Sequence, residues 1–173
     1  TDLIGQIQDM NRGVYLEDLL DAYPTGFCIG AAGYPEKHFE APNLVSDVAW
    51  VKRKVEAGAE YIVTQMFFDN HHYFSFLEEC RRQGIEVPII PGLKILTTRK
   101  QLTSIPRTFH CEIPPDLAEA VDQAGDGAVT ETGVNWTLRQ MRDLVEAGVP
   151  AIHIYVMQRS RAIRMLMDRF YEL

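Results

Sequence analysis

One short pattern recurs in this chain and limits the folds that the chain can adopt. The segments VEAGAEYIV, CRRQGIEVPII and VEAGVPAIHIYV each combine the end of a helical pattern, a glycine and an apolar run. Their glycines, Gly58, Gly84 and Gly148, stand just past a helix C-terminus, where glycine is favoured. Repetition of this unit predicts parallel strands connected by helices. The irregular spacing of the units argues against a solenoid.

Strands and helices can be placed from the apolar patterning. Strands are expected at 27–32, 61–68, 87–93 and 151–157, and because none alternates cleanly with polar residues, each is expected to be buried on both faces. Helices are expected at 45–57, 72–83, 98–104, 116–123, 136–147 and 159–173, with Pro106 ending the third. No linker-like stretch divides the chain, so a single domain is predicted.

Composition excludes several classes of protein. Of the 173 residues, 17 are Lys or Arg and 24 are Asp or Glu, giving a net charge of −7, which argues against a nucleic-acid partner. No apolar run approaches the roughly 20 residues of a membrane helix. The three cysteines form no CxxC pair, which indicates reduced thiols in the cytoplasm, with Cys28 expected in the core. The histidines show no metal-ligand spacing, so no metal site is predicted.

The order of elements fits either a doubly wound open sheet or a (β/α)8 TIM barrel. Neither the dinucleotide glycine fingerprint nor a P-loop is present. Polar residues gather just past the strand C-termini, the rim at which barrel enzymes hold their active residues. A complete barrel needs eight strands and roughly 250 residues. Four predicted strands, and a start at Thr1 without Met, therefore predict half of a barrel.

Several polar residues at this rim are candidates for ligand binding. The loop 33–41 (GYPEKHFEA) is either a ligand-binding loop or a solvated one, and the basic run 52–54 is either a phosphate clamp or a solvated helix face. Gln65 lies inside an apolar run. Its side-chain amide either forms hydrogen bonds with the polar ring of a ligand or forms them with groups of the protein core. Asp69 is expected to cap the following helix. Arg159 is either an anion binder or a surface residue.

The ordered segments GYPEKH, VKRKVEAGAEYIVTQMFFD, PIIPGL and IHIYVMQR together resemble the C-terminal half of the methylenetetrahydrofolate reductase family, in its short bacterial form. The resemblance runs over about residues 2–169. It implies that residues 1–173 form strands five to eight of one flavin-binding (β/α)8 barrel. It also implies reduction of methylenetetrahydrofolate to methyltetrahydrofolate with FAD and with NADH or NADPH, in one-carbon metabolism and methionine biosynthesis.

The resemblance also assigns roles to individual residues. It implies cofactor binding by Tyr34, His38, Ala41, Asp47, Arg53 and Lys54, and binding of the folate substrate by Gln65, Gln101 and Arg159. Two positions depart from the family pattern: Trp50 stands where other members can carry Asn, and Ile105 where some carry Phe.

The family's acid–base and flavin-tuning residues belong to the first half of the barrel. We therefore expect no catalytic residue in this chain, weak or no FAD binding, and no activity of the chain alone. A homo-oligomer is expected. Two alternatives stay open: a different barrel enzyme with a phosphorylated ligand, for which Lys94 is the candidate Schiff-base lysine, and a non-catalytic half-barrel that pairs with itself to cover its open strand edges.

Overall fold

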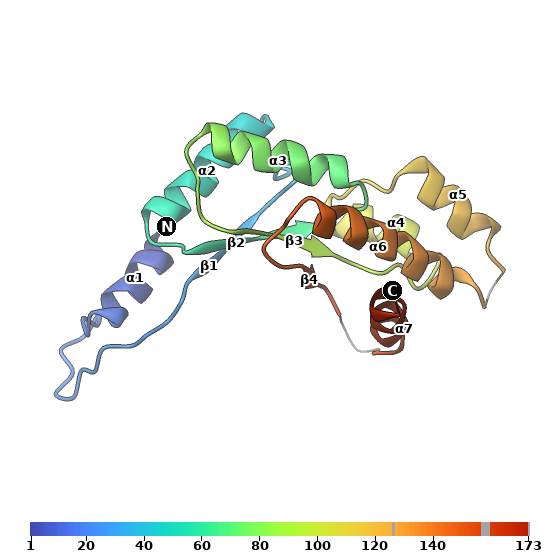
Figure 1. Cartoon of the computed structure of the whole chain (residues 1–173). Coiled ribbons are helices and arrows are strands. Elements are labelled where there is room, and N and C mark those ends of the chain that lie inside the picture. Colours follow the sequence, from blue (N-terminus) through green and yellow to red (C-terminus); the bar gives the residue numbers. More distant parts are fainter. Residues whose placement is uncertain (126, 157–159, 173) are drawn as a thin grey trace.

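The computed structural model describes residues 1–125, 127–156 and 160–172. Within these ranges four strands form one parallel sheet in the order β1-β2-β3-β4 (Figure 1). The strands are β1 (Gly30–Gly33), β2 (Tyr61–Met66), β3 (Ile89–Leu93) and β4 (His153–Ile154). Spatial order equals chain order, as expected when each strand is followed by a crossover helix to its neighbour.

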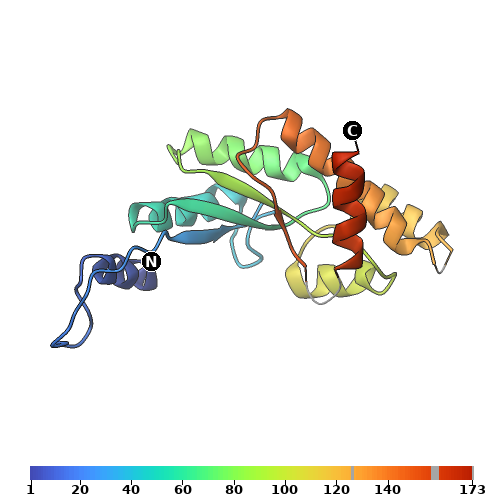
Figure 2. The ribbon, with the colours of Figure 1, turned by 60° about the horizontal axis from the view of Figure 1, so that its bottom comes forward.

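The connections carry the helices α1 (Asp2–Asn11), α2 (Leu44–Glu56), α3 (Asn70–Arg82), α4 (Gln101–Phe109), α5 (Pro115–Gln123), α6 (Val129–Glu146) and α7 (Arg161–Tyr171). Helices α2 and α3 lie side by side over one face of the sheet, whereas α1 and the chain after it project away from the sheet in both views (Figures 1 and 2). Among the helices of the described ranges, none offers the length of apolar surface that a bilayer core requires.

The three predicted glycine turns are confirmed. Gly58, Gly84 and Gly148 have φ of 117°, 80° and 76°. In each turn the residue after the glycine donates to the carbonyl five positions back, at 3.0, 3.0 and 3.2 Å, and the glycine donates to the carbonyl three positions back. This double bond is the Schellman arrangement, which satisfies the last helix carbonyls and sends the chain directly into the next strand or its approach.

The main core lies between the sheet and the helices over it. Ile62 of β2 and Ile89 of β3 are buried against Val48 of α2, Phe76 of α3 and Leu144 of α6. A second buried cluster lies at the carboxyl ends of the strands, where α4 and α5 pack. Its members are Met66, Phe68, Leu96, Ile105, Cys111, Leu117, Val121 and Val129.

The expectation of strands buried on both faces is wrong for β2. Its residues alternate: Ile62 is buried, whereas Tyr61, Val63 and Gln65 are only half-buried. Successive side chains of a strand point to opposite faces. The helices therefore cover one face, and Gln65 points to the other, where the described residues leave it partly accessible.

Three further expectations need correction. Helix α4 continues through Pro106, because its buried Ile105 holds this turn in the second cluster, and it ends at Phe109, followed by His110 in the left-handed region (φ 55°). Strand β4 is two residues long rather than seven, and residues 157–159 lie outside the described ranges. Cys28 is exposed, because β1 begins two residues later, whereas Cys80 and Cys111 are buried.

The approach of α6 to the segment after β3 yields a prediction about stability. A Cβ at Gly133 would lie 1.9 Å from the carbonyl oxygen of Leu96, a backbone atom that cannot move aside freely. Gly133→Ala should lower the free energy of unfolding in urea by about 1–3 kcal/mol. The matched control is Gly5→Ala in α1, where a Cβ meets nothing within 4 Å. Gly5→Ala should leave the free energy of unfolding unchanged or raise it by up to about 1 kcal/mol. Equal losses of stability in both variants would contradict the close contact between Gly133 and the carbonyl of Leu96.

Candidate functional site

The loop between β1 and α2 carries three of the predicted cofactor residues and is closed by its own hydrogen bonds. The amide of Lys37 donates to the carbonyl of Tyr34 at 3.0 Å, and the amide of Ala41 donates to the carbonyl of His38 at 2.9 Å. Lys37 has a positive φ of 68°, and its Nζ donates to the carbonyl of Ala41 at 3.0 Å. The ring of Tyr34 lies edge-on to that of His38, with centroids 4.7 Å apart. The loop is thus a defined structure.

Asp47 fixes this loop to α2. It stands in the first turn of the helix and is only 6% exposed. Its Oδ2 accepts the backbone N–H of His38 at 2.8 Å. A carboxylate is favourable at a helix N-terminus, where free N–H groups carry partial positive charge. Tyr34, His38 and Asp47, predicted separately as cofactor residues, therefore lie together.

The two predicted phosphate-binding cations diverge from the last turn of α2. Lys54 Nζ donates to the carbonyl of Ala32 in β1 at 2.8 Å. Burial lowers the pKa of Lys54, and the negative charge of Asp47 acts in the opposite direction. Arg53 is exposed and lies over the ring of Trp50, 4.3 Å from its centroid. Trp50, which departs from the family pattern, therefore supports the guanidinium of Arg53 by a cation–π contact.

Gln65, at the end of β2, meets the loop after β1. Its Oε1 accepts the N–H of Met66 at 3.0 Å. Gln65 lines a small pocket together with residues of that loop and of the segment after α4, among them Tyr34, Glu36, His110 and Cys111. The pocket measures only ≈ 10 Å³, about the space of one water. A ring-bearing ligand would therefore lie across its mouth and not inside it.

Of the other two predicted substrate residues, Gln101 is not among the described residues that line this pocket. Gln101 is the first residue of α4, and its Oε1 accepts the N–H groups of Thr97 and Thr98 at 2.7 and 3.0 Å. It therefore closes the turn before the helix. Arg159 lies outside the described residues. Asp69 caps α3 as predicted, because its side chain accepts the N–H of His71 at 2.9 Å.

Lys94, the candidate lysine of the alternative barrel enzyme, follows β3 and is partly buried. Its Nζ lies 3.4 Å from the carbonyl of Tyr155, and burial lowers its pKa. The hydroxyl of Tyr155 donates in turn to the carbonyl of Thr64 at 2.9 Å. These two bonds connect the segments after β3 and β4 to β2. Lys94 therefore has a structural role in this arrangement.

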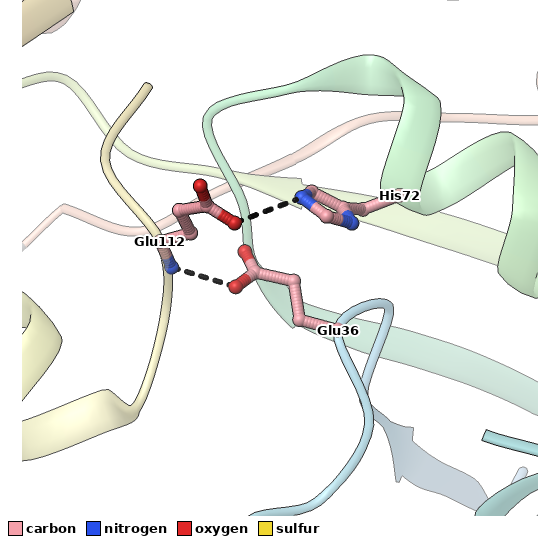
Figure 3. Close-up of side chains that lie close together, drawn as sticks. All are labelled: Glu36, His72 and Glu112. Carbon is pink, nitrogen blue, oxygen red and sulfur yellow. Dashed lines mark hydrogen bonds and ion pairs between the residues drawn. The ribbon is translucent and has the colours of Figure 1, made fainter. Parts of the chain in front are cut away.

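Sequence reasoning missed a cluster at the same rim, formed by Glu36, His72 and Glu112 (Figure 3). The Oε2 of Glu36 accepts the N–H of Glu112 at 2.6 Å, and Nε2 of His72 lies 3.7 Å from a carboxylate oxygen of Glu112. The three come from the loop after β1, the first turn of α3 and the α4–α5 connection. They are too far apart in the chain to form a local spacing pattern, so no motif could have revealed them.

Comparison with known proteins shows which family the chain belongs to. Residues 3–170 match the model of the methylenetetrahydrofolate reductase family. The chain belongs to this family. It is 33% identical over 174 residues to a Caenorhabditis elegans protein named as a probable methylenetetrahydrofolate reductase (NADPH), covering 92% of this chain and 26% of that one. It is 36% identical over 136 residues to the Escherichia coli 5,10-methylenetetrahydrofolate reductase, covering 78% and 46%. The chain thus spans between a quarter and a half of the length of these methylenetetrahydrofolate reductases.

A solved structure is also similar to this member of the reductase family. It is an uncharacterized protein from Clostridium thermocellum that binds two copies of 5-methyl-5,6,7,8-tetrahydrofolic acid. The TM-score is 0.55 at 19% identity, over 83% of this chain and 54% of that one. Together with the family match and the four-stranded parallel sheet, this likeness confirms the predicted α/β fold of the barrel type.

The bond between Asp47 and His38 yields a prediction about the loop. Asp47→Ala leaves the His38 amide without its acceptor and should lower the free energy of unfolding by about 1–3 kcal/mol. Amide exchange measured by NMR should show loss of protection at His38. Asp47→Asn keeps an acceptor oxygen and should lose less. As a control, Asp116→Ala removes an exposed carboxylate from the first turn of α5 and should cost less than about 1 kcal/mol; unchanged protection at His38 in Asp47→Ala would contradict the assignment.

Proposed function

We propose that the protein reduces methylenetetrahydrofolate to methyltetrahydrofolate with FAD and with NADH or NADPH. In this proposal residues 1–173 are the C-terminal half of one flavin-binding barrel and supply part of both the flavin site and the folate site. The observation that carries the proposal is the shared pocket of Tyr34 and Gln65. Tyr34 is expected to contact the cofactor and Gln65 the substrate. The flavin and folate rings must lie against each other for a hydride to pass between them, so residues for both are expected side by side.

The residues along β1 and α2 fit the chemistry of a flavin dinucleotide. The ring of Tyr34, with the turn from His38 to Ala41, offers an aromatic surface and backbone groups at the strand end. The buried carboxylate of Asp47 lies beside them and can accept from ribose hydroxyls. Arg53 is exposed, and a guanidinium group can donate several hydrogen bonds to phosphate oxygens. When bound, FAD supplies the carrier that accepts a hydride from the nicotinamide and passes it to the folate.

The folate side of the proposal depends on amide chemistry. The side chain of Gln65 has one acceptor and two donor hydrogens, which suit the edge of a pterin ring. Its oxygen is already directed by the N–H of Met66, so the orientation of the amide is set before a ligand arrives. Gln101 from α4 and Arg159 are proposed to contact the same substrate. The methyltetrahydrofolate bound by the Clostridium thermocellum protein supports a folate ligand on this fold.

The electron donor, the cellular location and the metabolic role are proposed from the family. One relative is named for NADPH, in Caenorhabditis elegans, and one for NADH, in Arabidopsis thaliana, so both donors belong to the proposal. We also place the protein in the cytoplasm, in the one-carbon metabolism that serves methionine biosynthesis, and expect it to form a homo-oligomer. The family match favours this function over a different barrel enzyme with a phosphorylated ligand.

A hybrid enzyme tests the proposal. The segment of the Escherichia coli reductase that aligns with this chain would be replaced by residues 1–173. We expect the hybrid to bind FAD, seen as visible absorbance, to lose that absorbance with NADH or NADPH, and to recover it with methylenetetrahydrofolate. A hybrid that folds by circular dichroism but neither binds FAD nor responds to the folate would contradict the proposal.

A single substitution in the same hybrid separates the two half-reactions. Gln65→Ala should slow reoxidation by methylenetetrahydrofolate by about 5–100-fold, the loss of one or two buried hydrogen bonds. Reduction of the flavin by the nicotinamide should stay within about twofold. Gln123→Ala serves as the control, because Gln123 pairs with Glu119 on the exposed face of α5. Equal losses in both half-reactions would show that Gln65 does not bind the pterin.

A further inference from the structure

The cluster of Glu36, His72 and Glu112 has no role in the proposed flavin and folate chemistry, yet it brings together three metal-ligating side chains (Figure 3). We propose that these three residues bind one divalent transition-metal ion, with Zn²⁺ as the representative. The ion would tie the loop after β1 to α3 and to the α4–α5 connection. This inference does not depend on the proposed reductase activity.

The distances suit one small ion after a slight closure of the site. One ligand atom from each residue lies within 4.8 Å of the other two, and the separation between Nε2 of His72 and Oε2 of Glu112 is 3.7 Å. Ligands held at about 2.0–2.2 Å around a tetrahedral zinc ion lie roughly 3.4 Å from one another. The side chain of Glu112 is 65% exposed, so it is free to move inward by the difference.

An independent observation points to a missing ligand at this place. Oε1 of Glu36 is fully buried and has no hydrogen-bond partner among the described residues. The other oxygen, Oε2, is held by the N–H of Glu112 at 2.6 Å, and Figure 3 shows the carboxylate lying between the other two side chains. A buried, unpaired carboxylate oxygen is costly, and each such atom in a folded protein requires an explanation such as an ion. A cation between the three residues would satisfy it.

The charges around the cluster favour the same ion. Burial raises the pKa of Glu36, and the negative charges of Glu112 and Asp69 act in the same direction, while the hydrogen bond from the Glu112 backbone N–H and the charge of His72 oppose them. A dication would neutralise the two carboxylates that the fold places side by side. Protonation of Glu36 is the competing way to relieve the same repulsion. Metal binding and protonation of Glu36 can be told apart, because only metal binding requires a metal ion and the imidazole of His72.

The ligand types favour a transition metal over magnesium or calcium. Imidazole nitrogen suits Zn²⁺ and its first-row neighbours, whereas Mg²⁺ and Ca²⁺ take oxygen ligands. One imidazole and two carboxylates supply three protein ligands, and the exposed side of Glu112 leaves the fourth position to water. Glu36 is two residues from both Tyr34 and His38, so a bound ion would fix the loop that carries them.

A calorimetric titration of the whole chain with Zn²⁺, after treatment with a chelator, tests the proposal. We expect one saturable site per chain, no comparable binding of Mg²⁺, and a higher thermal unfolding midpoint with zinc than without, because a ligand that binds only the folded state stabilises it. His72→Ala should weaken zinc binding by at least about tenfold, since even the loss of an outer-shell partner costs that much. Zinc should then no longer raise the midpoint.

Two matched controls keep the test decisive. His71→Ala removes the adjacent histidine, which is exposed and lies outside the cluster, and should leave zinc affinity unchanged. Glu36→Gln preserves the shape of the side chain but removes its charge and should weaken binding, whereas Glu40→Gln, on the exposed end of the same loop, should not. The chain binding no zinc, or His71→Ala and His72→Ala losing affinity equally, would overturn the proposal. Zinc binding that survives both His72→Ala and Glu36→Gln would be adventitious surface binding and would overturn it too.

Discussion

The structure depends on three helix-to-strand turns in which glycine adopts a positive φ. At Gly58, Gly84 and Gly148 the chain leaves a helix and turns back toward the sheet within two residues. Because every helix returns the chain to the same end of the sheet, all strands run parallel and their carboxyl ends share one rim. That rim carries the loop after β1, Gln65 and the Glu36 cluster. A residue with a Cβ at these positions would oppose the turn and thereby the arrangement of the rim.

Two carboxylates hold the loop after β1, that of Asp47, which is buried, and that of Glu36, which is partly buried. Asp47 receives the amide of His38, and Glu36 receives the amide of Glu112. The loop is thus attached to α2 on one side and to the α4–α5 connection on the other. A carboxylate accepts both bonds, and a hydrogen bond to an ionised acceptor is stronger than one between neutral groups. The position of Tyr34 at the pocket beside Gln65 follows from these two attachments.

Much of the fold could be predicted because its signals are local. The apolar runs, the glycines after each helix and the cap at Asp69 depend on neighbouring residues, and they placed β2, α2 and α3 within two residues at each end. The errors arose where tertiary contacts override local preference. Burial of Ile105 carries α4 through Pro106, and the late start of β1 leaves Cys28 exposed. An apolar run does not show that helices cover only one face of the sheet, because that depends on which elements lie opposite.

The sequence by itself determined the family, the parallel α/β fold and the identity of the residues proposed to hold flavin and folate, because those signals lie in contiguous motifs. Only the tertiary structure decided which of these residues meet. It placed Tyr34, His38 and Asp47 together, brought Gln65 to the pocket that Tyr34 lines, and left Gln101 at the start of α4, closing the turn before that helix. It also assembled Glu36, His72 and Glu112 from three distant segments. Distances between segments far apart in a chain are set by the packing of the elements that carry them, and no local pattern records that packing.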